Sequence, residues 1–456
     1  MAKDTKKDTV TMDKLINLAK SRGFIFAGSD IYGGLANSWD LGPLGAQLKK
    51  NIKDLWWKMF VEERPDVVGL DANIIMSTKI WEASGHLEGF NDVLIECKDC
   101  HERYRQDELE EDKGKKIEDI NCPKCGNKNW TTPTTFNTMF KTNLGPVESK
   151  ENTVYLRPET AQAMFVDFPE IVRVSRKRIP FGIAQIGKSF RNEITPGNFI
   201  FRLREFEQME IEYFIAPPKK DKEWEEHFDY WQSQVMEWIK RVGINPKKVV
   251  PVEISKEGRA HYSKKTVDFE FIYPFGQKEL YGLAYRTDYD ISKHQEYSGK
   301  NMKYKDPETG EEYIPHVIEP SLGVERTILA LLLSAYTEEE APTADGKKET
   351  RVVLKLPKEI APVKVAVLPL SNDPKLVELA KEQVFEPLIQ WFVAEYDDTQ
   401  SIGKRYRRQD EIGTPYCVTV DFESLKDNAV TVRDRDTMEQ DRVKIEKLEE
   451  HLKRKL

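Results

Sequence analysis

The sequence is poor in three things: long apolar runs, cysteine and excess positive charge. Its first residues, MAKDTKKDTVTMDKL, are polar and lack the apolar core of a signal peptide. No apolar run approaches the ~20 residues that are needed to span a bilayer. Five cysteines in 456 residues do not form the dense disulfide framework of a small secreted protein. We therefore expect a cytoplasmic protein with no membrane segment.

The charge balance limits how the protein could contact nucleic acid. Lys and Arg number 70 against 78 Asp and Glu, which gives a net charge of −8. A protein coated in basic surface is excluded, so any contact with nucleic acid has to use local basic patches. The length predicts two to three domains, and the composition is that of an ordinary globular protein.

The stretch from Phe190 to Phe214 is predicted to be an antiparallel hairpin. Its apolar-alternating runs end at Ile194 and resume at Phe199, around a Thr-Pro-Gly-Asn turn. Because side chains two residues apart on a strand share a face, the returning strand has an apolar face and a polar one. The apolar face holds Met209, Ile211, Tyr213 and Ile215, and the polar face holds Arg202, Arg204, Phe206, Gln208, Glu210 and Glu212.

Two interpretations of this polar face are open. An exposed hairpin with cross-strand ion pairs is one of them. The other is a nucleotide site, because forked arginine donors can hold phosphate oxygens and a ring at Phe206 can stack on a base. Arg191 and Glu193 share a face of the first strand, and Glu193 could accept from an exocyclic amine. The arrangement favours the nucleotide site.

A charged segment, residues 96–130, holds two CxxC pairs. They are Cys97 with Cys100 and, 21 residues later, Cys122 with Cys125. Paired CxxC elements at close to this spacing are typical of a tetrahedral zinc site. Four free cysteines in a core are the alternative, but we expect so polar a segment to be unable to build one. Four thiolates leave no open coordination position, so we predict a structural zinc.

Periodicity predicts most elements before residue 337. A core helix is expected from Ala46 to Glu62 and another over residues 223–242, with strands at 73–76, 267–272 and 280–286. Pro158 predicts a helix start, with Glu159 in the first turn, where its carboxylate could complement the helix dipole or contact a substrate. The stripe of the first helix contains Leu48, Ile52, Leu55, Trp56, Met59 and Phe60.

The C-terminal third predicts a glycine turn, a domain boundary and a small α/β domain. Ile318–Arg326 leads into an apolar helix, and a glycine at that helix start would admit phosphate or simply make a turn. Polar residues 337–350 predict the boundary, with a linker at 341–350. Strands and helices then alternate, including a helix over 374–395. The run Lys404–Arg408 suits either RNA contact or a solvated surface.

The spacing Phe-Arg-x-Glu, a loop, then Arg-x-x-x-Phe resembles motif 2 of the class II aminoacyl-tRNA synthetases. From about residue 20 to the end, the chain is similar to the dimeric glycyl-tRNA synthetases. The sequence words that carry this resemblance are SDIYGG (29–34), WEASGH (81–86), LRPETAQ (156–162), EFEQME (205–210) and EPSLG (319–323). The helix at 46–62 corresponds to motif 1, although Ser77 and Thr78 stand where its proline is expected, and the glycine turn corresponds to motif 3.

The resemblance implies an α+β fold and a homodimer. A class II antiparallel-sheet catalytic domain would cover residues 1–340, with a zinc-binding insert at 96–130, and an anticodon-binding α/β domain would cover 351–456. Glycine and ATP with Mg²⁺ would form glycyl-adenylate, and the glycyl group would pass to the 3′ end of tRNA(Gly). Glu279 and Glu319 would hold magnesium.

Site residues follow from the resemblance position by position. Arg191, Arg202 and Arg326 would be the catalytic arginines that hold phosphates, with Glu193 and Phe206 on the adenine. The remaining ATP contacts implied are Asn192, Phe201, Glu279, Leu280 and Gly323. For glycine, the resemblance implies Arg105, Glu159, Phe206, Glu210, Arg286, Glu319, Ser321 and Gly323. Glu210 is preferred over Glu207 because strand parity puts it on the face of Phe206.

Two rival functions remain for comparison. A non-catalytic nucleic-acid-binding relative would have lost the phosphate-holding arginines, and all three are present here. A class II synthetase for another amino acid would keep them. ATP–pyrophosphate exchange measured with each amino acid separates these possibilities.

Overall fold

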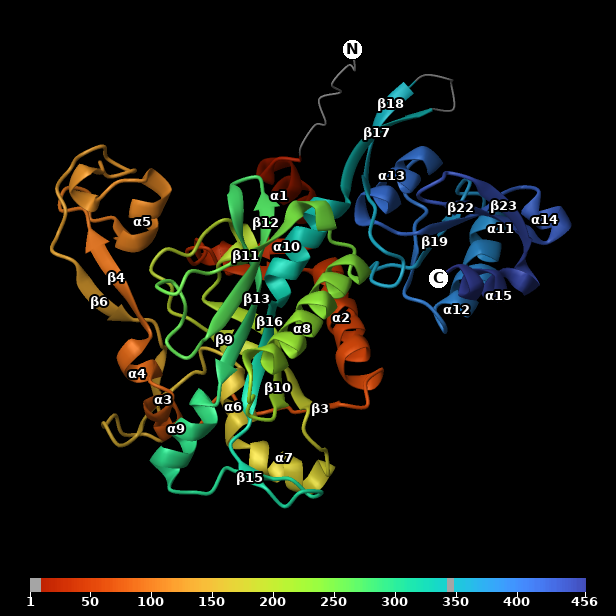
Figure 1. Ribbon diagram of the computed structural model, residues 1–456. Coiled ribbons are helices and arrows are strands. Elements are labelled where there is room, and N and C mark those ends of the chain that lie inside the picture. The colour runs from red at the N-terminus through yellow and green to blue at the C-terminus, as the bar shows by residue number, and fades with distance from the viewer. Residues whose placement is uncertain (1–9, 343–347) are drawn as a thin grey trace, which may run out of the picture.

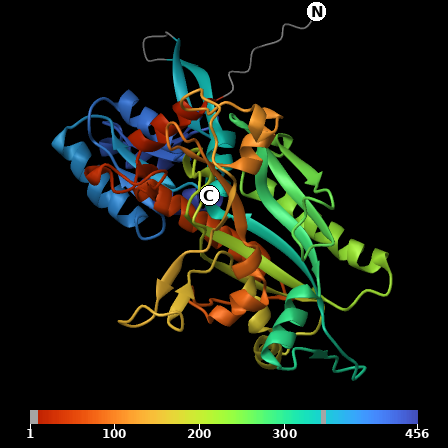
Figure 2. The same ribbon diagram turned by 90° about the vertical axis from the view of Figure 1, so that its left-hand side faces the viewer.

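The protein consists of a central sheet with an insert on one side and a C-terminal domain on the other. The computed structural model describes residues 10–342 and 348–456. Figure 1 shows the insert in orange and the C-terminal domain in blue, on opposite sides of the central strands. Figure 2 views the molecule from the insert side. The predicted α+β class is confirmed.

The central sheet has seven strands in the order β11-β12-β13-β16-β10-β9-β3. Neighbours are antiparallel except β3 and β9, which are parallel. The predicted hairpin partners β9 and β10 pair along their whole length, and β16 lies on the other side of β10. The strands are β3 (Val67–Gly69), β9 (Phe181–Phe190), β10 (Glu205–Ile215), β11 (Val249–Glu253), β12 (Lys265–Tyr273), β13 (Gly276–Thr287) and β16 (His316–Gly323).

Three helices pack with this sheet in one apolar core: α2 (Pro43–Trp57), which continues as a π-helical turn over Lys58–Glu62, α8 (Asp221–Arg241) and α10 (Val324–Ala335). The apolar faces predicted for the first helix and for the returning strand of the hairpin are confirmed. In α2 and its extension Leu48, Ile52, Leu55, Trp56 and Phe60 are buried, and the apolar face of β10 lies in the same core.

The hairpin turn is longer than predicted. β9 ends at Phe190 and β10 begins at Glu205, so residues 191–204 form a connecting loop and not two strand ends. Asn198 and Phe199 take positive φ angles of 55° and 61°, and the buried turn Phe199–Phe201 folds the loop back onto the core. Because these consecutive apolar side chains are all buried, the alternation of buried and exposed side chains that is typical of a strand ends here. Arg191, Glu193 and Arg202 are therefore loop residues.

Two further local predictions are wrong. The helix expected at Pro158 begins only at Ala161, because Leu156 is still paired with Ile75 in an isolated bridge. Glu159 thus precedes the helix and does not lie in its first turn. Residues 73–76 form no strand beyond that single bridge.

The insert forms a three-stranded sheet β5-β4-β6 with one helix, from β4 (Asn91–Glu96), β5 (Arg103–Arg105), α5 (Gln106–Lys113) and β6 (Thr134–Asn137). Against expectation it has a small apolar cluster of its own, made by Ile95, Leu109, Ile117 and Ile120. Cys97 and Cys122 are buried beside it, whereas Cys125 is exposed. Such a cluster is too small to bury all four thiols.

The C-terminal domain is a five-stranded mixed sheet, β20-β19-β21-β22-β23, with helices around it. The helix predicted over 374–395 ends at Leu388, and β20 follows. Its elements are β19 (Val365–Pro369), α11 (Pro374–Glu378), a π-helical segment (Leu379–Phe385), α12 (Glu386–Leu388), β20 (Ala394–Tyr396), α13 (Ile402–Ile412), β21 (Tyr416–Val420), α14 (Ser424–Asp427), β22 (Ala429–Asp434), β23 (Gln440–Lys444) and α15 (Ile445–Lys455).

An antiparallel pair, β17 (Tyr336–Pro342) and β18 (Lys348–Leu354), joins the two domains. The predicted linker, 341–350, therefore contains strand ends on both sides, and its residues 343–347 lie outside the described residues. Polar, Pro- and Gly-containing residues suit a hairpin turn as well as a linker. In residues 10–342 and 348–456, no helix is both long enough and apolar enough to cross a membrane.

The remaining elements lie around the central sheet. They are α1 (Met12–Ser21), β1 (Ile25–Ala27), β2 (Trp39–Leu41), α3 (Thr78–Ala83), α4 (His86–Gly89), β7 (Lys141–Asn143), β8 (Thr153–Tyr155), α6 (Ala161–Val166), α7 (Phe168–Ser175), α9 (Tyr289–Ser298), β14 (Tyr304–Lys305) and β15 (Glu312–Tyr313).

Candidate active site

A cavity of about 130 Å³ opens where the 191–204 loop, β10, β13 and the start of α10 meet. It brings together nine of the ten residues expected to contact ATP, although they come from four separate segments. These nine are Arg191, Glu193, Phe201, Arg202, Phe206, Glu279, Leu280, Gly323 and Arg326. The tenth, Asn192, lines a larger neighbouring cavity instead.

Three arginines approach the cavity, two from the 191–204 loop and one from α10. The guanidinium of Arg191 lies 5.4 Å from the ring centre of Phe206, and Arg326 pairs with Glu279 at 3.0 Å. Arg202 forms an ion pair with Glu108 on α5, the helix of the insert. Burial acts to lower the pKa of Arg326, but Glu279 outweighs it and raises that pKa. The cavity thus presents fixed cations beside an aromatic ring.

Glu210 lies beside the cavity at the centre of a buried polar group. One of its oxygens accepts from Ser321 Oγ at 2.6 Å, and the other accepts from Thr160 Oγ1. Ser321 and Gln208 line the cavity and both contact this carboxylate group. Burial raises the pKa of Glu210, and the nearby Glu159 raises it further. Glu210 therefore adjoins the cavity through Ser321 and Gln208.

Glu159 is held by a histidine that the sequence did not point to. His86 Nε2 lies 3.3 Å from Glu159 Oε2, and its Nδ1 lies 2.7 Å from Ser84 Oγ. Burial alone would raise the pKa of Glu159, but His86 and Arg286 lower it well below its usual range. His86 lies in the WEASGH word, yet a single histidine carries no spacing signal that could have identified it.

Arg286 is already paired within the protein. Only 1% of it is exposed, and it forms two hydrogen bonds with Asp290, at 2.8 and 2.9 Å, and one with Glu319 at 2.7 Å. Neither Arg286 nor Glu319 lines the cavity. Asp290 was missed because its role depends on this i,i+4 contact at the start of α9. The structure therefore places Arg286 among carboxylates.

The two proposed magnesium residues lie in different surroundings. Glu279 lines the cavity and pairs with Arg326, whereas Glu319 lies with Glu210 and Glu212. The charge of Arg326 lowers the pKa of Glu279, so that this carboxylate is ionised. Only Glu279 faces the space in which phosphates could lie.

Arg105 also lies away from the cavity. It is at the end of β5 in the insert, where it pairs with Asp107 at 2.6 Å and with Asp92 at 3.4 Å. These ion pairs hold the insert helix to its strands. The structure does not bring Arg105 together with Glu210 or Ser321 in one cavity.

Strand parity separates Glu207 from Glu210 as predicted. Glu207 pairs with Lys49 at 2.8 Å and with Lys53 at 2.7 Å, both on α2. Glu210 instead contacts Ser321 on β16 and Thr160 before α6. The two carboxylates therefore contact different groups of residues, although only two residues lie between them in the sequence.

Glu212 is a third residue that the sequence analysis did not select, after His86 and Asp290. Its side chain is fully buried, and within the described part of the chain neither of its oxygens has a hydrogen-bond partner. Carboxylate oxygens of Glu210, Glu212 and Glu319 lie within 4.8 Å of one another. Burial and the neighbouring Glu319 raise the pKa of Glu212 well above its usual range.

Glu212→Gln is expected to stabilise the free protein, increasingly so as the pH rises. A carboxyl whose folded pKa is raised keeps a proton that the unfolded chain releases, so its presence lowers stability above the unfolded pKa. The loss amounts to about 1.4 kcal/mol for each pH unit up to the folded pKa. Denaturant unfolding at pH 5 and pH 8 measures it.

The exposed Glu205 on the same strand provides the control, since Glu205→Gln should change neither value by much. A Glu212→Gln protein that is less stable than the wild type at pH 8 would contradict a protonated, buried Glu212.

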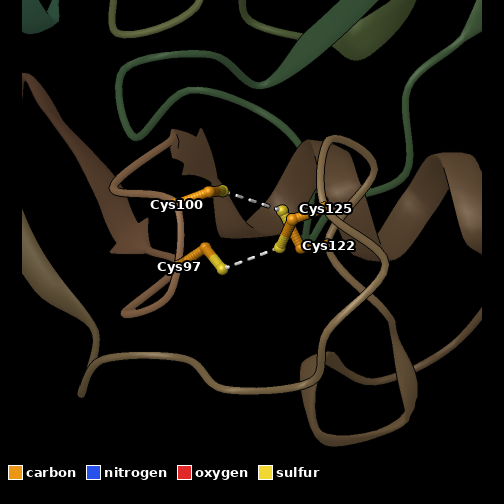
Figure 3. Close-up of side chains that lie close together, drawn as sticks. All are labelled: Cys97, Cys100, Cys122 and Cys125. Atoms are coloured by element: carbon orange, nitrogen blue, oxygen red, sulfur yellow. Dashed lines mark hydrogen bonds between the residues drawn. The ribbon is translucent and has the colours of Figure 1, made fainter.

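The four cysteines of the insert lie together (Figure 3). Cys97 Sγ is 3.5 Å from Cys125 Sγ, and Cys100 Sγ is 3.6 Å from Cys122 Sγ. In tetrahedral zinc with Zn–S near 2.3 Å, the sulfurs are roughly 3.8 Å apart. All four sulfurs lie within 4.8 Å of one another, so the group fits one tetrahedral ion.

The basic run on α13 is largely occupied by contacts within the domain. Arg405 is 1% exposed and donates to main-chain oxygens of Thr399 and Gln400. Arg408 pairs with Asp397. These two arginines therefore support the fold of the domain more than they offer a free basic surface.

Residues 140–335 match the tRNA synthetase class II core domain (G, H, P, S and T), and residues 364–455 match the anticodon binding domain. With its seven-stranded sheet and the arginine-lined cavity, the chain is a class II aminoacyl-tRNA synthetase. It is 53% identical to the glycine–tRNA ligases of Clostridium acetobutylicum and Caldanaerobacter subterraneus, over 99% and 98% of this chain and 100% and 99% of theirs. The chain belongs to the glycine–tRNA ligase family.

A solved structure gives the same fold at lower similarity. The prolyl-tRNA synthetase from Cryptosporidium parvum, complexed with halofuginone and AMPPNP, superposes with a TM-score of 0.64 at 16% identity. The match covers 97% of this chain and 76% of that one. At this identity the likeness shows the fold alone.

Proposed function

We propose that the cavity binds ATP and that the adjoining buried carboxylates bind the ammonium group of glycine. The chain, as a glycine–tRNA ligase, forms glycyl-adenylate from these substrates and transfers the glycyl group to the 3′ end of tRNA. The observation that carries this assignment is the convergence of Arg191 and Arg202 from one loop, Phe206 from β10 and Arg326 from α10 on one cavity. Ser321 and Gln208 join that cavity to Glu210.

Each cation has a distinct role in this proposal. Arg191, close to the ring of Phe206, would hold the α-phosphate, where negative charge develops when the glycine carboxylate attacks. Arg202 and Arg326 would hold the terminal phosphate and stabilise the leaving pyrophosphate. Phe206 would stack on adenine, and Glu193 would accept from its amine. No side chain has to act as a nucleophile, so positioning and charge stabilisation supply the catalysis.

Class II synthetases use ATP with Mg²⁺. Glu279 fits such an ion because its carboxylate is ionised and faces the cavity. A magnesium ion held by Glu279 would supply positive charge that offsets the charge of the phosphates. Glu319, which pairs with Arg286, would belong to the part of the site that binds glycine.

Glycine has no side chain to grip, so recognition must be polar and exclusion must be steric. Glu159, Glu210 and Glu319 would surround the ammonium, with Ser321 beside the α-carbon. Because Arg286 is already paired with Asp290 and Glu319, its role toward the substrate carboxylate would require one of these pairs to open.

ATP–pyrophosphate exchange tests the proposed function directly. Glycine should support exchange, whereas proline, threonine and serine should support none above background. Exchange with another of these amino acids in place of glycine would overturn the proposal.

We also propose one structural zinc per chain, held by Cys97, Cys100, Cys122 and Cys125. Metal analysis of the purified protein should find one equivalent, and a Cys97→Ser/Cys122→Ser variant should lose it. Cys417 is buried in the C-terminal domain, so Cys417→Ser is the matched control and should keep the metal. Zinc that is absent from the wild type, or undiminished in the double variant, would refute the site.

The domain roles and the dimer complete the proposal. Residues 1–340 would form the catalytic domain and 351–456 the domain that binds the tRNA(Gly) anticodon, which the two family matches support. A homodimer is supported by three exposed apolar side chains, Ile31, Tyr32 and Leu35, of which Leu35 lines the larger cavity together with residues of α2. Sedimentation should give twice the chain mass, and a monomer at micromolar concentration would exclude a stable dimer.

A further inference from the structure

We infer that Glu325 is a positioning residue for the nucleotide site and that Lys49 is the partner that makes this role possible. The inference rests on the proposed function, because it assumes that ATP occupies the cavity. It goes further by assigning roles to two residues that contact each other and to which the proposed function assigns no substrate contact.

Glu325 joins three elements through a single carboxylate. It is the second residue of α10, directly before Arg326. One of its oxygens accepts from the main-chain N–H of Glu207 at 2.8 Å, and the other accepts from Lys49 Nζ at 2.8 Å. Only 7% of Glu325 is exposed, so these contacts are shielded from water. The start of α10, the start of β10 and α2 are therefore held together at one point.

The contact with Glu207 continues the sheet where a strand stops. Gln208 on β10 is paired with Gly323 at the end of β16, where the chain turns into α10. The next N–H along β10, that of Glu207, has no β16 residue opposite it, and the carboxylate of Glu325 takes that place. A buried N–H without a partner is strongly unfavourable, so this bond fixes the position of the helix start relative to β10.

The bond matters for ATP because it lies between two proposed ATP contacts. Phe206 is the residue before Glu207, and Arg326 is the residue after Glu325. Both line the cavity, as does Glu325 itself. A carboxylate that ties Glu207 to the start of α10 thus sets the distance between the ring proposed for adenine and the cation proposed for the terminal phosphate.

Lys49 supplies the charge that this arrangement needs. A carboxylate next to Arg326 would weaken the attraction of the site for phosphates if it were unpaired. Lys49 pairs with both Glu325 and Glu207 at 2.8 Å. Burial acts to lower the pKa of Lys49, but Glu325 and Glu207 outweigh it, so the lysine stays charged. The carboxylate can therefore act as a tether without repelling ATP.

Glu325 also borders a second cavity. Glu325 lines both the small cavity and the neighbouring one of about 1150 Å³, whose wall includes Lys49 and other residues of α2. The Lys49–Glu325 ion pair thus links α2 to the residue directly before Arg326.

Pyrophosphate exchange by Glu325→Ala and Lys49→Met tests the inference. Both variants should raise the KM for ATP and lower kcat, with a combined loss in kcat/KM for ATP of about tenfold or more, and should leave the KM for glycine within about twofold. Glu325→Gln keeps an acceptor for the Glu207 N–H and should recover much of the loss. Lys50→Met is the matched control, because Lys50 is the next residue on α2 and, among the residues that the structure describes, pairs with the exposed Asp54 alone.

The outcomes separate this inference from the proposed function. Arg326→Ala is measured alongside: a normal KM for ATP in that variant would refute the nucleotide site itself. If Arg326→Ala raises this KM but folded Glu325→Ala does not, only the positioning role is refuted. An equal rise in the KM for both substrates would also refute it, since general loosening of the domain predicts that result. Should Glu325→Ala not fold, Lys49→Met decides by the same criteria.

Discussion

Arg191→Ala is expected to leave the fold intact and to reduce adenylate formation by on the order of 10²-fold or more. Arg191 lies in the loop after β9 with its guanidinium close to the ring of Phe206, so it can contact the phosphate nearest the base. Its guanidinium donates a hydrogen bond to the Pro158 carbonyl oxygen, and the loss of that side-chain bond should not unfold the domain. The measurement is glycine-dependent pyrophosphate exchange with circular dichroism as the check on folding.

Arg204→Ala is the control for this experiment. Arg204 is in the same loop and donates to the Ala36 carbonyl oxygen, but it lines the larger cavity and not the small one. Its removal should change exchange by far less. Near-normal exchange by a folded Arg191→Ala protein would mean that the α-phosphate is held elsewhere.

Glu210→Gln is expected to raise the glycine concentration needed for exchange by about 10- to 100-fold, and to change the ATP requirement little. A hydrogen bond to a charged group contributes about 1.5–3 kcal/mol, and the substitution removes the charge that would face the ammonium. Because the pKa of Glu210 is raised by burial and by Glu159, the KM for glycine should also rise as the pH falls toward that pKa. The variant should show a flatter pH profile.

Glu207→Gln separates the two faces of β10. Glu207 is also a buried carboxylate, but it pairs with Lys49 and Lys53 on the side away from Ser321. Its replacement should raise the KM for glycine much less than Glu210→Gln does. If the two variants behaved alike, or if Glu210→Gln chiefly weakened ATP binding, the arrangement of carboxylates around the ammonium would have to be abandoned.

Local patterns in the sequence were sufficient for several features. The period of α2 identified its buried stripe, and the parity of β10 placed Glu207 and Glu210 on opposite faces. The CxxC spacing grouped four sulfurs that the fold then brought within 4.8 Å. Each of these predictions depends on geometry that repeats over a few residues, so the fold around them hardly alters it.

The sequence by itself thus determined the family and the main elements, and it predicted which residues would hold phosphates. The tertiary structure alone decided which charges meet: Arg286 with Asp290 and Glu319, Glu159 with His86, and Lys49 with Glu325, a residue 276 positions away. It also decided that Glu212 is buried without a partner in the described chain, and that the loop after β9 folds back at Phe199. The physical reason is that burial and pairing depend on how distant segments pack, and no short-range periodicity encodes that packing.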